Sequence, residues 1–143
     1  MTARFFADTN IAVYTLDATD QKRRQALAVM RQRPVISTQV VNEFLNVMLG
    51  KRKLERAQAY RLARILMRRC DVVAVTPDIT DLSMTIGERY QLSHWDSLIV
   101  AAALAAGCDT LYSEDMQDGQ VFEGRLTLKN PFVGSATLGA NAT

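Results

Sequence analysis

Short apolar runs alternate along the chain with longer segments whose apolar residues recur at helical spacing. The short runs predict strands over residues 4–7, 35–36, 72–75 and 110–112, and a weaker one over 126–128. The longer segments predict helices over residues 11–16, 20–31, 38–49, 54–69, 79–90 and 94–106. Strands that alternate with helices favour a parallel sheet covered on both faces. The predicted fold is therefore α/β, a three-layer α/β/α sandwich with a central, mostly parallel sheet.

One of these helices differs from the others in being apolar on every side. Residues 98–106 contain no polar side chain, and a helix of this kind is buried. Ser93 is expected to cap its beginning, and Gly107 to end it. This helix should pack directly against the sheet.

Length and composition predict one ordinary soluble domain. The chain has 143 residues, of which 48% are apolar and 22% charged, so we expect a single domain over residues 1–133 and a flexible tail over 134–143. Two cysteines are too few for a fold that depends on disulfide bonds. No apolar run approaches the roughly 20 residues of a membrane span. Asp8 interrupts the short apolar start, so no signal peptide is expected. We predict a reduced, cytoplasmic protein without membrane contact.

Charge is distributed unevenly, although the whole chain carries only +2. Residues 51–69 hold eight basic residues against one acid, a local charge of +7, so the rest of the chain carries −5. Arg61, Arg64 and Arg68 share one face of the helix predicted there. Such a face is either a solvated surface or a binding site for a polyanion such as RNA.

Four acidic residues are expected at the same edge of the predicted sheet: Asp8, Glu43, Asp96 and Asp115. Three of them also have an ordinary structural interpretation when each is taken alone. Asp8 suits the cap of the next helix, Asp96 suits a first helical turn, and Asp115 suits a solvated loop. Glu43 differs because it falls within the apolar stripe of its own helix, where an unpaired carboxylate costs several kcal/mol.

Taken together, the four acids predict a cation site. Carboxylates that converge on one crevice repel each other and raise each other's pKa values unless a cation neutralises them. Carboxylate ligands that have no group of cysteine or histidine ligands near them favour Mg²⁺ or Mn²⁺. Such ions catalyse phosphodiester cleavage by orienting and activating a water.

Four segments of the chain carry a family resemblance: Phe6-Ala7-Asp8-Thr9-Asn10, Val41-Asn42-Glu43-Phe44, residues 94–103 and Leu111-Tyr112-Ser113-Glu114-Asp115. In this order they resemble the signature segments of PIN-domain ribonucleases, especially VapC-type toxins of toxin–antitoxin systems. The resemblance runs from Arg4 to about Phe132. It implies a metal-dependent endoribonuclease that cuts RNA, often tRNA, forms a homodimer and is inhibited by a cognate antitoxin.

By the same resemblance, Asp8, Glu43, Asp96 and Asp115 would hold the metal, with Asn10 and Ser113 as supporting polar groups. The fourth acidic segment offers three candidates, Glu114, Asp115 and Asp118. Asp115 is chosen because it matches the third position of the family pattern. Asp118 is the second choice.

Two other functions are kept as alternatives. One is a Mg²⁺-binding, phospho-accepting receiver module with Lys129 as the phosphate-contacting lysine, although Thr9 stands where a receiver has a second acid. The other is a PIN-like module that has lost catalysis and only binds a partner. A hydrolase triad at His94 is set aside, because neighbours on one helix cannot adopt that geometry. Trp95 and Tyr90 are interpreted as packing or oligomer-contact residues rather than as base-stacking surfaces.

Overall fold

The computed structural model describes residues 3–16 and 19–132; the predicted tail over 134–143 lies outside them. In chain order the elements are β1 (Phe5–Ala7), α1 (Thr9–Tyr14), α2 (Asp20–Met30), β2 (Val35–Ser37), α3 (Thr38–Leu49), α4 (Arg56–Arg69), β3 (Asp71–Val73), α5 (Pro77–Tyr90), α6 (His94–Ala105), β4 (Thr110–Tyr112), β5 (Val121–Phe122) and β6 (Leu126–Lys129).

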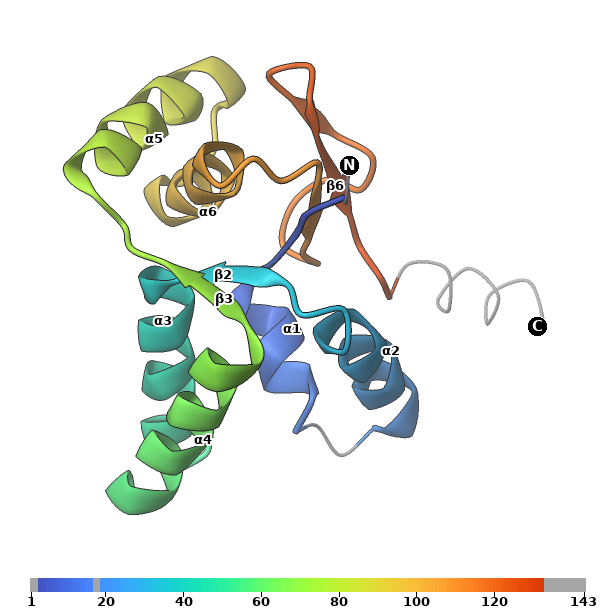
Figure 1. Ribbon diagram of the computed structural model, residues 1–143, viewed down its shortest axis with the longest axis vertical. Helices are drawn as coiled ribbons and strands as arrows, with labels where there is room; N and C mark the ends of the chain where they lie inside the picture. Colours follow the sequence, from blue (N-terminus) through green and yellow to red (C-terminus); the bar gives the residue numbers. More distant parts are fainter. Residues whose placement is uncertain (1–2, 17–18, 133–143) are drawn as a thin grey trace.

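The strands form one sheet in the order β3-β2-β1-β4-β6-β5, covered by helices on both faces. Figure 1 shows α5 and α6 on one side of β2 and β3, and α1, α3 and α4 on the other. Every neighbouring pair is parallel except β5 and β6, which are antiparallel. The predicted three-layer sandwich with a mostly parallel sheet is confirmed.

One half of the core lies where the sheet meets α6, and the helices on the other face bury the rest. Residues 97–104 of this helix are all buried, as its uniformly apolar sequence predicts. Ser93 caps the helix through its Oγ, which accepts from the Asp96 backbone N–H at 3.1 Å. Gly107 follows the helix with a φ of +73°, a conformation that costs a glycine little. Both ends of α6 are therefore where the sequence places them, and Asp96 is fixed in its first turn.

Two strands differ from the prediction by more than one residue. β3 ends at Val73 rather than at residue 75, because the Val75 N–H turns out of the sheet and donates to Thr38 Oγ1 at 3.1 Å. The hairpin strand β5 was not predicted; it is two residues long and pairs only with β6. Neither difference moves the carboxyl ends of β1 and β4, where the candidate acids lie.

Helix beginnings differ from the prediction by two residues in three places. α1 begins at Thr9 instead of residue 11, because the Asp8 side chain caps it. α5 begins at Pro77, which suits a first helical position. α4 begins at Arg56, since Leu54 still belongs to the turn after α3 and its N–H donates to the Met48 carbonyl.

Within residues 3–16 and 19–132, none of the helices combines the length and hydrophobicity that crossing a bilayer requires.

Candidate metal centre

The side of β1 on which successive strands are added to the sheet changes between β3 and β4, which makes the gap between β1 and β4 a topological switch point. β2 and β3 extend the sheet from one side of β1, whereas β4 and β6 extend it from the other. In open parallel sheets, ligands bind at the carboxyl ends of the strands at such a switch point. Asp8 directly follows β1, and Ser113 to Asp115 follow β4. The fold therefore brings these two segments to the place where a ligand is expected.

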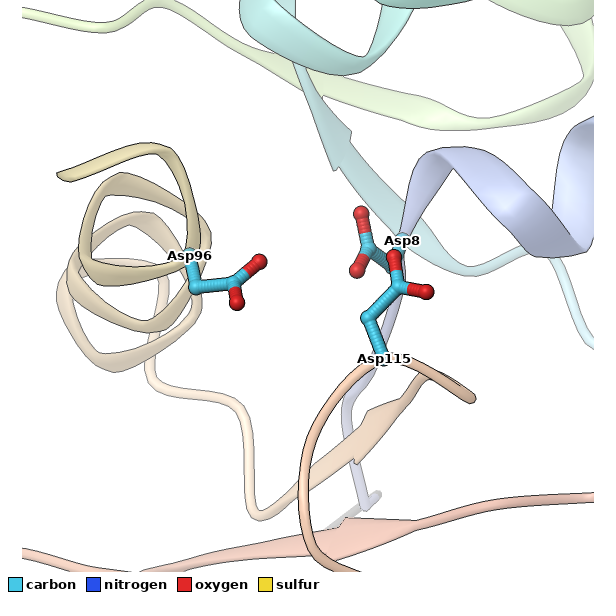
Figure 2. Close-up of side chains that lie close together, drawn as sticks. All are labelled: Asp8, Asp96 and Asp115. Atoms are coloured by element: carbon cyan, nitrogen blue, oxygen red, sulfur yellow. The ribbon is translucent and has the colours of Figure 1, made fainter. Parts of the chain in front are cut away.

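Three of the four predicted acids meet there. Asp8, Asp96 and Asp115 each place a carboxylate oxygen within 4.8 Å of those of the other two. Figure 2 shows Asp96 extending from α6 toward the other two carboxylates, which lie close together. The side chains come from three separate parts of the chain, so the cluster is a product of the tertiary fold.

Asp8 has a structural role and also faces the cluster. It is 3% exposed, and its Oδ1 caps α1 by accepting from the Thr9 N–H at 2.7 Å. Its Oδ2 accepts from the Ser113 hydroxyl at 2.8 Å. Asp8 therefore caps α1 and at the same time belongs to the three-acid cluster.

Ser113 and Asn10 connect Asp8 to the loop that carries Asp115. The Ser113 Oγ accepts from the Asp115 backbone N–H at 3.1 Å. The Asn10 Nδ2 donates to Asp115 Oδ2 at 3.0 Å and lies 3.4 Å from Ser113 Oγ. These contacts hold an otherwise exposed carboxylate in position beside a buried one. They match the supporting positions that the family resemblance implies for Asn10 and Ser113.

The electrostatics of the cluster disfavour three bare carboxylates. The pKa of Asp8 is raised from 3.8 to about 7, chiefly by burial; hydrogen bonds from Ser113 and Thr9 act to lower it, and the charges of Asp115 and Glu43 act to raise it. Burial and the charge of Asp115 also raise the pKa of Asp96, while a hydrogen bond with Ser93 lowers it. A bound cation would remove the repulsion and favour the ionised forms.

Glu43 lies beside the three-acid cluster rather than within it. It is half-buried on α3, as its place in the apolar stripe predicts. Burial raises its pKa, a hydrogen bond with Gln39 lowers it, and the charges of Asp96 and Asp115 raise it. Its Oε1 is buried and has no hydrogen-bond partner in the described part of the chain. Such an oxygen costs free energy unless a ligand, an ion or a water satisfies it.

The two other acids of the fourth segment have different partners. Glu114 hydrogen-bonds to the Tyr14 hydroxyl and forms an ion pair with Lys22 at 3.6 Å. Asp118 Oδ1 accepts from the Asn130 N–H at 2.8 Å, which fixes the turn before β5. Of the three candidates, Asp115 is therefore the one that meets Asp8 and Asp96.

The donor set fits a hard divalent cation. Three carboxylates converge, and no thiol or imidazole belongs to the cluster among the residues described. Two further buried oxygens beside it, Thr9 Oγ1 and Asn10 Oδ1, also lack a hydrogen-bond partner within the described ranges. Oxygen-only surroundings of this kind suit Mg²⁺ or Mn²⁺.

The comparison with protein families decides the family. A family model of the PIN domain matches residues 5–117, most of the chain, and the match includes all four candidate acids. The chain belongs to the PIN domain family. This membership agrees with the resemblance of the four acidic segments and favours a PIN domain over the receiver alternative. No curated protein matches the sequence with significance.

Solved structures share the fold of this PIN domain at low sequence identity. A toxin–antitoxin complex from Klebsiella pneumoniae is 21% identical with a TM-score of 0.67, over 91% of this chain and 98% of that chain. DNA-bound VapBC from Salmonella typhimurium is 15% identical with a TM-score of 0.69, over 91% and 99%. The sarcin-ricin loop cleaving toxin VapC20 from Mycobacterium tuberculosis is 21% identical with a TM-score of 0.62, over 78% and 91%.

The two aromatic residues considered from sequence, Trp95 and Tyr90, differ in burial. Trp95, expected to pack or to contact another subunit, is 63% exposed at the start of α6, so it is not part of the core of this PIN domain. Tyr90 does pack, edge to face against Phe122 with ring centroids 5.0 Å apart. The amide residues of α3 near Trp95 were not singled out, because exposed amides on a helix carry no distinctive sequence signal.

Proposed function

We propose that this protein is a metal-dependent endoribonuclease and acts as the toxin of a toxin–antitoxin pair. The observation that carries the proposal is the convergence of Asp8, Asp96 and Asp115 at the switch point of the sheet. Membership of the PIN domain family and the fold shared with VapC toxins support it. The substrate class is RNA, with tRNA as the expected target, and the cytoplasm is the expected compartment.

Each acid is given a role that follows from its position. Asp8, Asp96 and Asp115 would hold Mg²⁺ or Mn²⁺, and Glu43 would bind the metal or position the attacking water. When bound, the ion supplies an activated water and stabilises negative charge on the phosphate. Ser113 and Asn10 keep the carboxylates of Asp8 and Asp115 aimed at a common point through the hydrogen bonds described above.

Basic residues lie next to the acids on one side. A cavity of about 420 Å³ is lined by Glu43 and Asp115 and also by Lys51 and Arg52. Of the basic residues in the segment 51–69, these two line this cavity. We infer that they contact RNA phosphates, whereas the exposed Arg61, Arg64 and Arg68 on α4 guide the strand from farther away.

Salt dependence tests this division of the basic residues. The double variant Lys51→Gln, Arg52→Gln is expected to reduce the slope of log binding constant against log salt by about 1.4, since each contact to single-stranded RNA contributes about 0.7. Binding of a labelled oligoribonucleotide by a cleavage-deficient Asp8→Asn background, from low to high salt, measures it. An unchanged slope would remove Lys51 and Arg52 from the RNA-binding surface. The matched variant of Arg61, Arg64 and Arg68 reports whether the α4 face contributes.

The proposed protein partners come from the family and its structures. One solved structure with this fold is a toxin–antitoxin complex from Klebsiella pneumoniae, and another is FitAcB from Neisseria gonorrhoeae, which is 19% identical. We propose that this chain likewise binds a cognate antitoxin and forms a homodimer.

Digestion of total cellular RNA tests the proposed activity. Purified protein free of antitoxin is expected to produce discrete cuts with Mg²⁺ or Mn²⁺ and none with a chelator, because the three carboxylates need a cation to act together. Mapping the cut ends identifies the RNA target. Absence of cuts with either metal would instead support the alternative of a catalytically inactive PIN module that only binds a partner.

A further inference from the structure

A second pocket lies on the other side of Glu43 from the basic cavity. It has a volume of about 530 Å³, in the range of small-molecule sites, and lies between α3 and the beginning of α6. Gln39, Asn42, Asn46 and Trp95 line it together with Glu43. Among the described residues that line it, none is basic, so the pocket favours an uncharged group over a phosphate.

Trp95 gives this pocket an aromatic surface next to the acids. It is the only tryptophan of the chain, it is 63% exposed, and it directly precedes Asp96 on α6. Its backbone carbonyl accepts from Gln39 Nε2 at 3.1 Å, which ties the start of α6 to α3. The backbone at this position is therefore fixed. The rings of His94 and Trp95 lie edge to face with centroids 5.2 Å apart, and the exposed part of the indole remains open to a flat ligand.

The amides of α3 supply polar groups at the opposite wall. Gln39, Asn42 and Asn46 recur at i, i+3 and i+7, so they share one face of the helix. Gln39 Oε1 is buried and without a hydrogen-bond partner in the described part of the chain. Asn42 Nδ2 donates to the Thr38 carbonyl at 3.0 Å, which leaves its Oδ1 as an acceptor. Amides of this kind can both donate to and accept from the edge of a base.

We propose that this pocket binds one nucleobase of the RNA strand next to the cleaved bond, with the base stacked on Trp95 and its edge hydrogen-bonded by the α3 amides. The inference rests on the proposed nuclease function and adds a residue that selects the base. Proteins read unpaired RNA bases in this manner, by stacking on aromatic rings and by hydrogen bonds to base edges.

The position of Glu43 links the base pocket to the cleavage centre. Glu43 lines this pocket and also the basic cavity, which holds Asp115, Lys51 and Arg52. A strand that crosses Glu43 would place a base on the Trp95 side and phosphates on the basic side. The pocket without basic residues thus suits the base of a nucleotide, and the basic cavity suits its phosphate.

Intrinsic fluorescence tests the stacking directly, because all tryptophan emission comes from Trp95. In the Asp8→Asn variant, which prevents cleavage, a single-stranded oligoribonucleotide is expected to quench this emission. An oligomer of the same length whose residues lack bases should quench it much less. Equal effects of the two oligomers, or no quenching by either, would overturn the inference.

Cleavage kinetics test whether the stacked base contributes to the reaction. Trp95→Ala is expected to lower kcat/KM for a short oligoribonucleotide by about 5- to 150-fold, the usual effect of removing one base-stacking ring, and Trp95→Phe by less. Met84→Ala is the matched control, since Met84 is also exposed (57%) but lies on α5. Replacing Asn42 and Asn46 with Ala should reduce the preference among the four bases beside the cut.

The outcomes separate this inference from the proposed function. Cleavage by the wild type with no loss in Trp95→Ala would overturn the base pocket and leave the nuclease intact. No cleavage by the wild type would overturn the nuclease, and the fluorescence comparison alone would then decide whether the pocket binds a base. Light scattering measures whether Trp95→Ala changes the size of the assembly. If it does, and if the oligomers with and without bases change the tryptophan emission equally, a second copy of the chain covers Trp95 and the inference is overturned.

Discussion

Replacement of Asp8 by Asn is expected to lower RNA cleavage by about 10³-fold or more while leaving the fold intact. Removing even one neutral hydrogen-bond donor to a transition state lowers kcat by about 10²- to 10³-fold. Asp8 is a charged group that acts on the transition state, so we expect its loss to lower the rate at least as much. Asn keeps the size and the capping ability of Asp, so α1 should still begin at Thr9. Initial rates on the mapped RNA target, with circular dichroism of the same samples, measure the effect.

Asp96→Asn should have a similar effect, because Asp96 belongs to the same three-acid cluster. Asp118→Asn is the matched control: it changes an acid of the loop after β4 whose carboxylate caps the turn at Asn130 instead of facing the cluster. The control should retain activity within a few fold. Full activity in both Asp8→Asn and Asp96→Asn would refute the assignment of the metal site.

The stability of the metal-free protein is expected to fall as pH rises from about 4 to about 7. Burial raises the pKa of Asp8 to about 7 in the folded protein, whereas the unfolded chain ionises near 3.8. The folded state then binds more protons across this interval, so ionisation favours unfolding by about 4 kcal/mol. This contribution is fully present below about pH 4 and is lost as pH passes through 7.

Denaturant unfolding in chelator at several pH values between 5 and 8 measures this effect. The difference in unfolding free energy between the wild type and Asp8→Asn isolates it, since Asn cannot ionise. Mg²⁺ added at pH 7.5 should raise the melting temperature of the wild type and have little effect on the variant, because a cation that binds the ionised cluster stabilises the folded state. Parallel pH curves for the two proteins would contradict the prediction.

Much of the fold follows from local sequence signals. The apolar run in α6, its cap at Ser93 and its end at Gly107 are local features, and the structure agrees with each of them. β5 was not predicted because Val121 and Phe122 form a strand only through pairing with β6. A local signal for this hairpin existed in Gly124, which has a φ of +66° between the two strands.

The candidate site was predictable as a set of acids but not in its geometry. The predicted order of strands and helices placed Asp8, Glu43, Asp96 and Asp115 at one edge, and the structure brings the three aspartates together. Sequence could not separate Asp115 from Glu114, because the choice depends on distant partners such as Tyr14, Lys22 and Asn10. Nor could it place Glu43 beside the cluster, since that depends on the packing of α3.

The position of β4 has a consequence for how this protein is made. β4 lies in the middle of the sheet next to β1, yet its residues come late in the chain. During translation, Asp8 and Asp96 leave the ribosome before Ser113 and Asp115. β1 therefore cannot pair with β4, the strand that precedes Ser113 and Asp115, until these later residues are synthesised. A nascent chain therefore has no complete cleavage centre until residues 113–115 have been synthesised and β4 has paired with β1.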